Sequence, residues 1–142
     1  MKVILILLNL IILNESCNES KINQDSISFE YSAMSRGQFL EIKANKKTTS
    51  IKKNRTDAAI LKPTEEKQWE GLINALKSVT IKNISELKAP SEKRFFDGAA
   101  IGNLKITYEG KTYESQSFDH GNPPEEIAQL VKEILSISEN IE

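Results

Sequence analysis

The sequence predicts an α+β fold, in which an antiparallel sheet of about five to six strands carries two helices on one face. Short stretches alternate apolar and polar residues, as half-buried strands do, and two longer stretches carry the apolar stripe of an amphipathic helix. These stretches form two hairpin-then-helix units in series. A single sheet with both helices on one side buries all of the apolar faces.

The first unit begins with a strand that places Ile27, Phe29 and Tyr31 on one face. Arg36-Gly37 indicates a loop before a second strand. The segment after the turn at Lys46-Lys47 is expected to form a third strand. Lysines on an edge strand discourage pairing with other sheets. We therefore expect strands over residues 26–32, 38–44 and 48–53, with the last of them at an edge.

The first helix begins near Pro63, with Glu65 and Glu66 in the first turn, where the helix dipole favours acidic side chains. Its apolar residues recur at helical spacing, which predicts that Trp69 belongs to the core. A short strand is expected at 79–81. The stripe comprises Trp69, Leu72, Ile73 and Leu76.

The second unit begins with Leu104, Ile106 and Tyr108 in alternation, and Glu109-Gly110 forms a tight turn into a strand over 111–118. In the last helix we expect Asn122 as the N-cap, Pro123 at the first helical position and Glu125 in a capping box. The helix repeats the stripe spacing through Ile127, Leu130, Val131 and Ile134.

The N-terminus predicts export. A basic start, Met1-Lys2, precedes an apolar run over residues 3–13, which ends just before a polar stretch. This is the pattern of a secretory signal peptide. A membrane-spanning helix needs roughly 20 apolar residues, so the run is too short to be a permanent anchor.

Ser16 directly precedes Cys17, the only cysteine of the chain. This ending resembles the lipoprotein signal peptide of bacteria, in which a small residue precedes a cysteine that is acylated and becomes the new N-terminus. Ser16 and Cys17 fit that pattern, whereas Asn14 and Glu15 depart from it. The resemblance implies cleavage between Ser16 and Cys17, lipidation of Cys17, and a location on the periplasmic face of a membrane or on the cell surface. Cleavage that leaves Cys17 free, or cleavage elsewhere, is the alternative.

The domain organisation follows from this pattern. We expect a signal peptide over 1–16, a lipid-anchored polar tether over 17–25, one α+β domain over 26–138 and a polar tail over 139–142. Removal of 1–16 deletes one charge of each sign and leaves the net charge at −1. A nucleic-acid binder would carry a basic excess, so we expect no nucleic-acid partner.

The charges are unevenly distributed along the chain. One short stretch is basic, whereas residues 109–142 carry eight acidic residues and two lysines. These are either two solvated faces or, for the basic stretch, a hairpin edge that meets an anionic partner such as lipid headgroups or an acidic glycan. The basic residues are Lys43, Lys46, Lys47, Lys52, Lys53 and Arg55.

Two loops are candidate sites. In the first, over residues 85–103, Phe95 and Phe96 follow Arg94 and precede Asp97. This segment either presents a phenyl ring to a partner or buries both rings as it crosses the core. In the second, Asp119-His120-Gly121 lies between a strand and a helix N-terminus, where backbone N–H groups bind anions. The alternative for the second loop is an ordinary turn.

Catalysis is not expected. A Ser-His-Asp arrangement would need His120, the only histidine, and Asp119 cannot orient it, because adjacent strand residues point to opposite faces. Acylation of Cys17 would also remove the only thiol. We expect no catalytic residues, cofactor or metal site. The expected protein is a small lipoprotein with a binding or scaffolding role, and its expected partner is a protein or a cell-envelope glycan. The alternatives are a secreted inhibitor that uses the 85–103 loop, and a hydrolase that uses His120.

Overall fold

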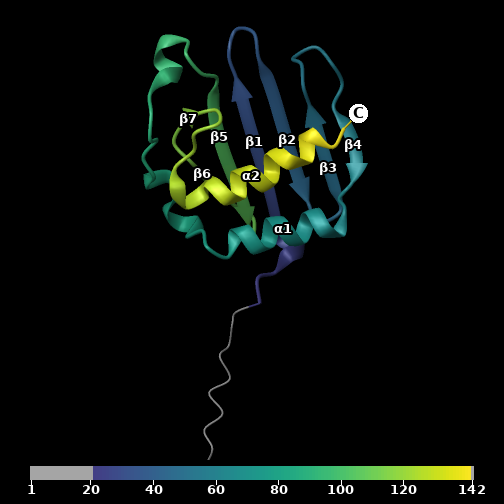
Figure 1. Cartoon of the computed structure of the whole chain (residues 1–142). Coiled ribbons are helices and arrows are strands. Elements are labelled where there is room, and N and C mark those ends of the chain that lie inside the picture. The colour runs from purple at the N-terminus through teal and green to yellow at the C-terminus, as the bar shows by residue number, and fades with distance from the viewer. Residues whose placement is uncertain (1–20, 142) are drawn as a thin grey trace, which may run out of the picture.

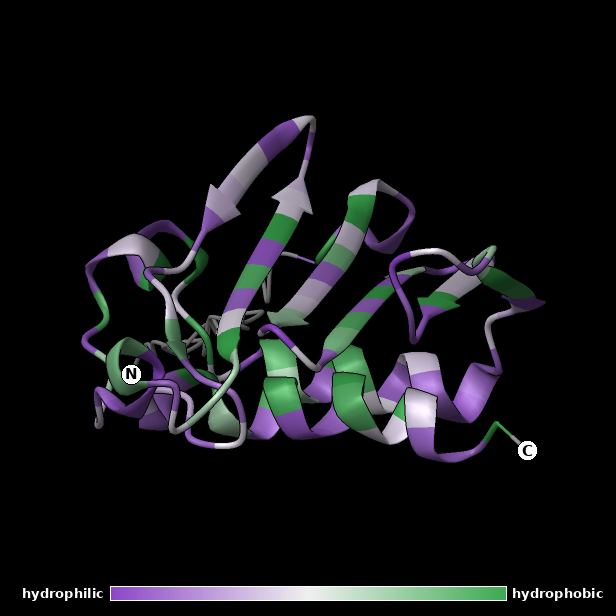
Figure 2. Ribbon diagram, turned by 90° about the horizontal axis from the view of Figure 1, so that it is seen from above, coloured by the Kyte–Doolittle hydropathy of each residue, from purple (hydrophilic) through white to green (hydrophobic). Residues whose placement is uncertain are grey.

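A seven-stranded antiparallel sheet forms the centre of the protein, and two helices cross one of its faces (Figure 1). The computed structural model describes residues 21–141. The view from above shows α1 (Glu66–Leu76) and α2 (Glu125–Glu139) on the same side of the sheet (Figure 2). The predicted α+β class and the one-sided helix layer are confirmed, with at least one strand more than expected. The predicted signal peptide, Ser16 and Cys17 lie outside the described residues.

The sheet has the strand order β4-β3-β2-β1-β5-β6, and β7 pairs with the beginning of β5. The first four strands therefore form a meander, after which the chain returns through α1 to place β5 on the free side of β1. The strands are β1 (Ile27–Met34), β2 (Phe39–Asn45), β3 (Thr48–Lys52), β4 (Ile60–Pro63), β5 (Ile101–Tyr108), β6 (Lys111–Glu114) and β7 (Phe118–Asp119).

The core lies between the sheet and the helices. Along β1 every second residue is buried, as the alternation predicts. Phe29 lies opposite Ala44 on β2 and Ile106 on β5, and its ring centroid is 5.8 Å from that of Trp69 on α1. The predicted stripes of both helices are buried, and α1 packs against α2.

The turn at Glu109-Gly110 is confirmed. Both residues have positive φ, at 50° and 79°, and they join β5 to β6 as a two-residue hairpin loop. Glycine is needed at this turn because it adopts positive φ without a steric penalty.

The strand predicted over residues 48–53 is present as β3, but its predicted place at an edge of the sheet is wrong. β4 pairs with β3 on its outer side, so β3 lies inside the sheet. Ile60 and Leu61 gave no alternating pattern in the sequence, because β4 has only four residues and none of them is fully buried. The basic stretch is also divided: Lys46 and Lys47 lie at one end of β3, and Lys53 and Arg55 follow its other end.

Two further strand predictions are wrong. The 79–81 segment is not a strand, because the chain there leads into the 3₁₀-helix η2 (Ile81–Glu86). The strand expected over 111–118 is interrupted between β6 and β7. At the interruption Ser115 N–H donates to the Leu104 carbonyl, and Ser115 Oγ accepts from Leu104 N–H at 3.0 Å. The Ser115 hydroxyl thus takes the place of a backbone carbonyl as the acceptor for Leu104 N–H, and the chain bends at this point.

The predicted cap of the last helix is wrong. Pro124 is the N-cap of α2, with extended backbone angles of −50° and 141°. A residue that precedes proline is disfavoured in the helical region, which prevents Pro123 from starting the helix. Asn122 instead donates from Nδ2 to Ser91 Oγ at 2.8 Å.

The end of the predicted tether belongs to the folded domain. Ile22 packs against the core, and residues 24–26 form the 3₁₀-helix η1. Gln24 Oε1 accepts a hydrogen bond from Trp69 Nε1 at 3.0 Å. An indole N–H that is mostly buried needs such a partner, and the N-terminal segment supplies it.

Candidate functional site

The two loops that the sequence singled out form one site, because a buried ion pair joins them. Arg94 Nη1 lies 3.1 Å from Asp119 Oδ1, and the two side chains are 7% and 2% exposed. Asp119 ends β7 and lies opposite Ile101 at the beginning of β5. The pair therefore fastens the 3₁₀-helix η3 (Lys93–Phe96) to the edge of the sheet.

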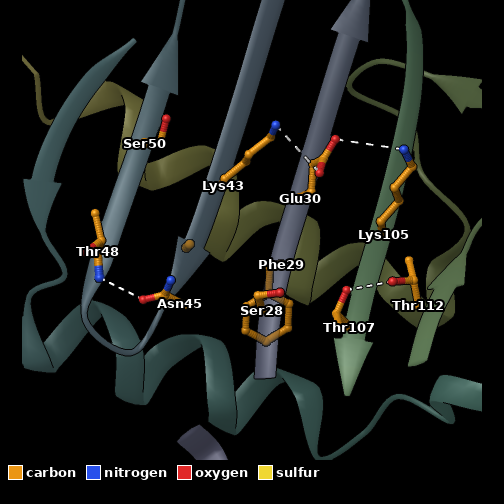
Figure 3. A pocket seen from close by; sticks show the side chains of 11 residues that line it. Ser28, Phe29, Glu30, Lys43, Asn45, Thr48, Ser50, Lys105, Thr107 and Thr112 are labelled. Atoms are coloured by element: carbon orange, nitrogen blue, oxygen red, sulfur yellow. Dashed lines mark hydrogen bonds and ion pairs between the residues drawn. The ribbon is translucent and has the colours of Figure 1, made fainter. Parts of the chain in front are cut away.

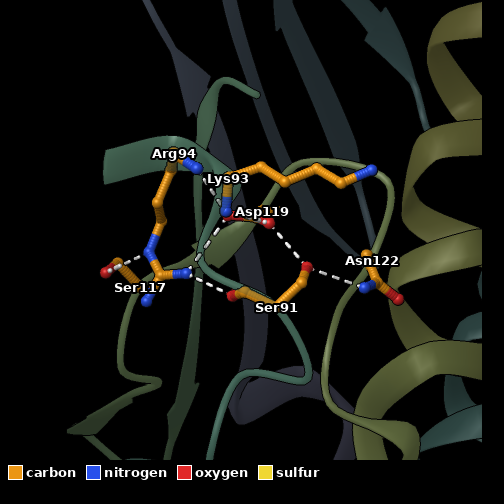
Figure 4. A network of polar contacts seen from close by, with 6 residues as sticks. All are labelled: Ser91, Lys93, Arg94, Ser117, Asp119 and Asn122. Carbon is orange, nitrogen blue, oxygen red and sulfur yellow. Dashed lines mark hydrogen bonds and ion pairs between the residues drawn. The ribbon is translucent and has the colours of Figure 1, made fainter. Parts of the chain in front are cut away.

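The Asp119 carboxylate accepts four hydrogen bonds (Figure 4). Ser91 Oγ and Lys93 N–H donate to Oδ2 at 2.5 and 2.8 Å. Arg94 donates to Oδ1 twice, from its backbone N–H at 2.9 Å and from Nη1. Burial by itself raises the pKa of a carboxyl group, but the hydrogen bonds from Ser91, Arg94 and Lys93 outweigh burial and hold the pKa of Asp119 well below its ordinary value.

The Arg94 guanidinium is held equally firmly. Besides Asp119, it donates from Nε to Ser117 Oγ at 3.1 Å and from Nη1 to the Ser91 carbonyl at 2.7 Å. Ser91 Oγ in turn accepts from Asn122. Ser91, Ser117 and Asn122 are members of the site that the sequence did not identify, because nothing in their local sequence indicates a partner about 30 residues away.

The loop beyond Arg94 turns sharply and returns to the sheet. Asp97 adopts the left-handed conformation with φ of 56°, and Gly98 N–H donates to the Lys93 carbonyl at 2.9 Å. Asp97 is a residue type that tolerates this conformation. In the structure, Asp97 therefore serves to form this turn.

Phe95 and Phe96 are presented to solvent. They are 63% and 83% exposed, so the interpretation in which the loop buries both rings is wrong. The Arg94 guanidinium carbon lies 4.3 Å from the centroid of the Phe95 ring. Stacking on a guanidinium that is already fixed by Asp119 restricts the ring and makes a cation–π contact.

His120 faces the other way and belongs to a separate pair. Its Nδ1 lies 2.7 Å from Tyr31 Oη, and its backbone N–H donates to the Ala100 carbonyl. Burial lowers the pKa of His120 and raises the pKa of Tyr31 far above its ordinary value. Tyr31 Oη and His120 Nδ1 thus share one hydrogen bond, and the tautomer of the neutral imidazole decides which of them donates. Gly121 has φ of 90° and makes the turn that follows.

The open face of the sheet carries a shallow polar hollow of about 480 Å³ (Figure 3). Glu30 lies at its centre, 3.9 Å from both Lys43 and Lys105. Lys43 also lies 3.3 Å from Glu41. These charges largely neutralise one another, and exposed pairs of this kind contribute little to stability.

Comparisons with known proteins assign no family to this chain. The sequence matches no protein-family model and none of the curated protein sequences. Among residues 21–141 no helix is long and apolar enough to cross a membrane. The same residues contain no group of three or more His, Cys, Asp or Glu side chains placed to hold a metal ion.

Proposed function

We propose that this chain is a lipid-anchored binding protein of the bacterial cell envelope that contacts a partner protein through Phe95 and Phe96. The observation that carries the proposal is the exposure of two adjacent phenyl rings on a loop that a buried ion pair holds in place. We call Ser91–Gly98, which carries these rings, the aromatic loop.

The aromatic loop has the properties of a protein-binding element. Aromatic residues, phenylalanine included, are enriched at the cores of protein–protein interfaces. A loop that is already ordered loses little conformational entropy when a partner binds. Asp119 supplies that order, because its carboxylate fixes the backbone of Lys93 and Arg94.

The groups that could support catalysis are engaged in structural contacts. The Asp119 carboxylate is saturated by donors from residues 91–94, and the His120 ring is hydrogen-bonded to Tyr31. These contacts favour a binding role over the hydrolase alternative.

The anchor part of the proposal rests on Ser16 and Cys17 in the sequence. Acyl chains on Cys17 would hold the protein on a bilayer, because each buried methylene contributes about 0.8 kcal/mol. The test is the intact mass of the protein from bacterial membranes, compared with a Cys17→Ser variant. We expect a mature chain that begins at Cys17 and carries acyl groups, and a Cys17→Ser variant without them. A mature mass without acyl groups would contradict the anchor.

The contact surface is tested by a photo-crosslinking amino acid placed at Phe96 in the full chain expressed in bacteria. A matched chain carries the same amino acid at Asn74, an exposed position on α1. We expect a discrete crosslinked protein from position 96 only, and its loss when Phe95→Ala is added. Identical products from both positions would show that the aromatic loop is not the contact surface.

A further inference from the structure

A cleft of about 870 Å³ lies between the N-terminal segment and α1, at the end of the domain where the predicted anchor joins it. Three lysines line it: Lys21, Lys46 and Lys77. Asp25 is the acidic residue of the lining, and its Oδ1 lies 3.1 Å from Lys46 Nζ. Within residues 21–141, Lys21 and Lys77 form no ion pair. The lining thus carries two ammonium groups without a counter-charge from this domain.

We infer that this cleft binds the phosphate of an anionic phospholipid headgroup and seats the domain directly on the membrane. The inference rests on the proposed acylation of Cys17 and specifies the surface that the anchored domain turns towards the bilayer. Ile22 is the half-buried apolar residue of the lining, and Ile73, which belongs to the core, lies at its base. Binding at a membrane interface is strengthened by buried apolar area and by the attraction of basic groups to anionic lipids.

The number of residues between Cys17 and the cleft limits the distance between the cleft and the bilayer. Three residues lie between Cys17 and Lys21, so the Cα atoms of these two residues are at most about 14 Å apart. The folded domain begins at once, since Ile22 contacts the core and Gln24 is bound to Trp69. This upper limit exceeds the screening length of about 8 Å at physiological salt, so the lysines are attracted to an anionic surface when the intervening chain is not fully extended.

The same geometry turns the aromatic loop away from the membrane. β1 begins at Ile27 beside the cleft and ends at Met34, which lies opposite Ile101 at the root of the aromatic loop. Eight strand residues span about 25 Å. Figure 1 shows the N-terminal segment below the sheet and the segment before β5 at the opposite end. Headgroup binding at one end would therefore present Phe95 and Phe96 to partners at the other.

The test uses the full acylated chain on vesicles of phosphatidylcholine with or without phosphatidylglycerol. Since acylation consumes Cys17, a single added cysteine carries a fluorophore, at Asn74→Cys on α1 or at Gly37→Cys in the β1–β2 turn. A quencher attached to the lipid headgroup reports proximity. We expect phosphatidylglycerol to increase quenching at position 74 and to leave position 37 unchanged.

Removal of the lysines supplies the matched comparison. Lys21→Gln with Lys77→Gln should reduce the ratio of headgroup-bound to unbound domains by about thirtyfold. Lys52→Gln with Lys53→Gln removes the same charge at the opposite end of β3 and should leave this ratio unchanged.

The outcomes separate the two proposals. Acylated protein that floats with both vesicles but shows equal quenching in both overturns headgroup binding and leaves the anchor standing. Equal effects of the two lysine pairs also overturn it, because they would indicate a general charge effect. A chain that carries no acyl groups overturns both proposals, since nothing would then hold the cleft near the bilayer.

Discussion

Arg94 and Asp119, 25 residues apart in the sequence, form an ion pair of 3.1 Å that is almost closed to solvent. Burial of such a pair is costly unless the remaining hydrogen-bonding groups are satisfied. Here Ser91, Ser117 and the backbone of Lys93 satisfy them. The consequence is a fixed loop that exposes two phenyl rings.

Removal of the Asp119 charge should release the aromatic loop. In Asp119→Asn the amide keeps the size of the side chain but loses the ion pair and half of its acceptors. We expect amide hydrogen exchange over residues 91–98 to become markedly faster, measured by mass spectrometry. Asp97→Asn, at an exposed position of the same loop, is the control and should leave the exchange of residues 91–94 unchanged. Unchanged exchange in Asp119→Asn would mean that the loop is held by other contacts.

The Asp119 interactions should make stability depend on pH in the acid range. The folded-state pKa is depressed from 3.8, so the stabilisation is complete above about pH 5 and is lost as the pH falls towards the depressed value. Urea unfolding of wild type and Asp119→Asn should therefore differ by a constant amount between pH 5 and pH 7. The difference should shrink below about pH 4. A difference that grows on acidification would contradict the assigned direction.

His120 should titrate below its usual value of 6.5, because burial disfavours the imidazolium. The neutral form is favoured in the folded state, so this contribution to stability is complete above about pH 6.5 and is lost as the pH falls. Tyr31→Phe removes the hydroxyl bonded to Nδ1 but leaves the ring buried, so the pKa of His120 should stay below 6.5. As the only histidine, His120 gives one clear set of imidazole signals in an NMR titration. A His120 pKa that rises to 6.5 in Tyr31→Phe would show that the hydrogen bond, and not burial, lowers it.

Phe96 should matter for binding and not for stability. With 83% of the residue exposed, Phe96→Ala should change the free energy of unfolding by no more than about 0.5 kcal/mol. Phe29 is the matched buried ring, and Phe29→Ala should cost about 3–5 kcal/mol. Both values come from urea unfolding. A large loss in Phe96→Ala would assign the ring a structural role.

Gly102 should tolerate no side chain, because Phe118 lies against it. A Cβ at Gly102 would approach Phe118 Cε2 to 2.8 Å, and that ring precedes Asp119 on β7. Gly102→Ala should cost about 1–3 kcal/mol by urea unfolding. Gly37→Ala meets no atom within 4 Å and should change stability by less than about 1 kcal/mol. Equal effects of the two substitutions would show that Phe118 moves aside easily.

Local sequence patterns predicted the elements in which residues nearby in the sequence determine whether a side chain is buried or exposed. The alternation around Phe29 identified the buried face of β1, and the stripe through Trp69 identified the buried face of α1. The same patterns failed at β4, which is too short to alternate and has no fully buried residue. They also failed at Asn122, which suited a helix cap by type but found a partner in Ser91.

The candidate site was predicted as two separate loops, each with some of its residues. Phe95 and Asp119 were selected as candidate site residues from the sequence around each of them. Neither stretch of sequence indicates that the two loops lie side by side. The pairing of β7 with β5 brings them together, after the chain has passed through β5 and β6.

The sequence by itself determined the class of the fold, the buried faces of its strands and helices, and the turn at Glu109-Gly110, because periodicity and backbone preference are local properties. The tertiary structure alone decided that Arg94 meets Asp119, that both phenyl rings face solvent and that Gln24 belongs to the domain. The physical reason is that a buried polar group must find a partner, and long-range strand pairing determines which partner lies within reach.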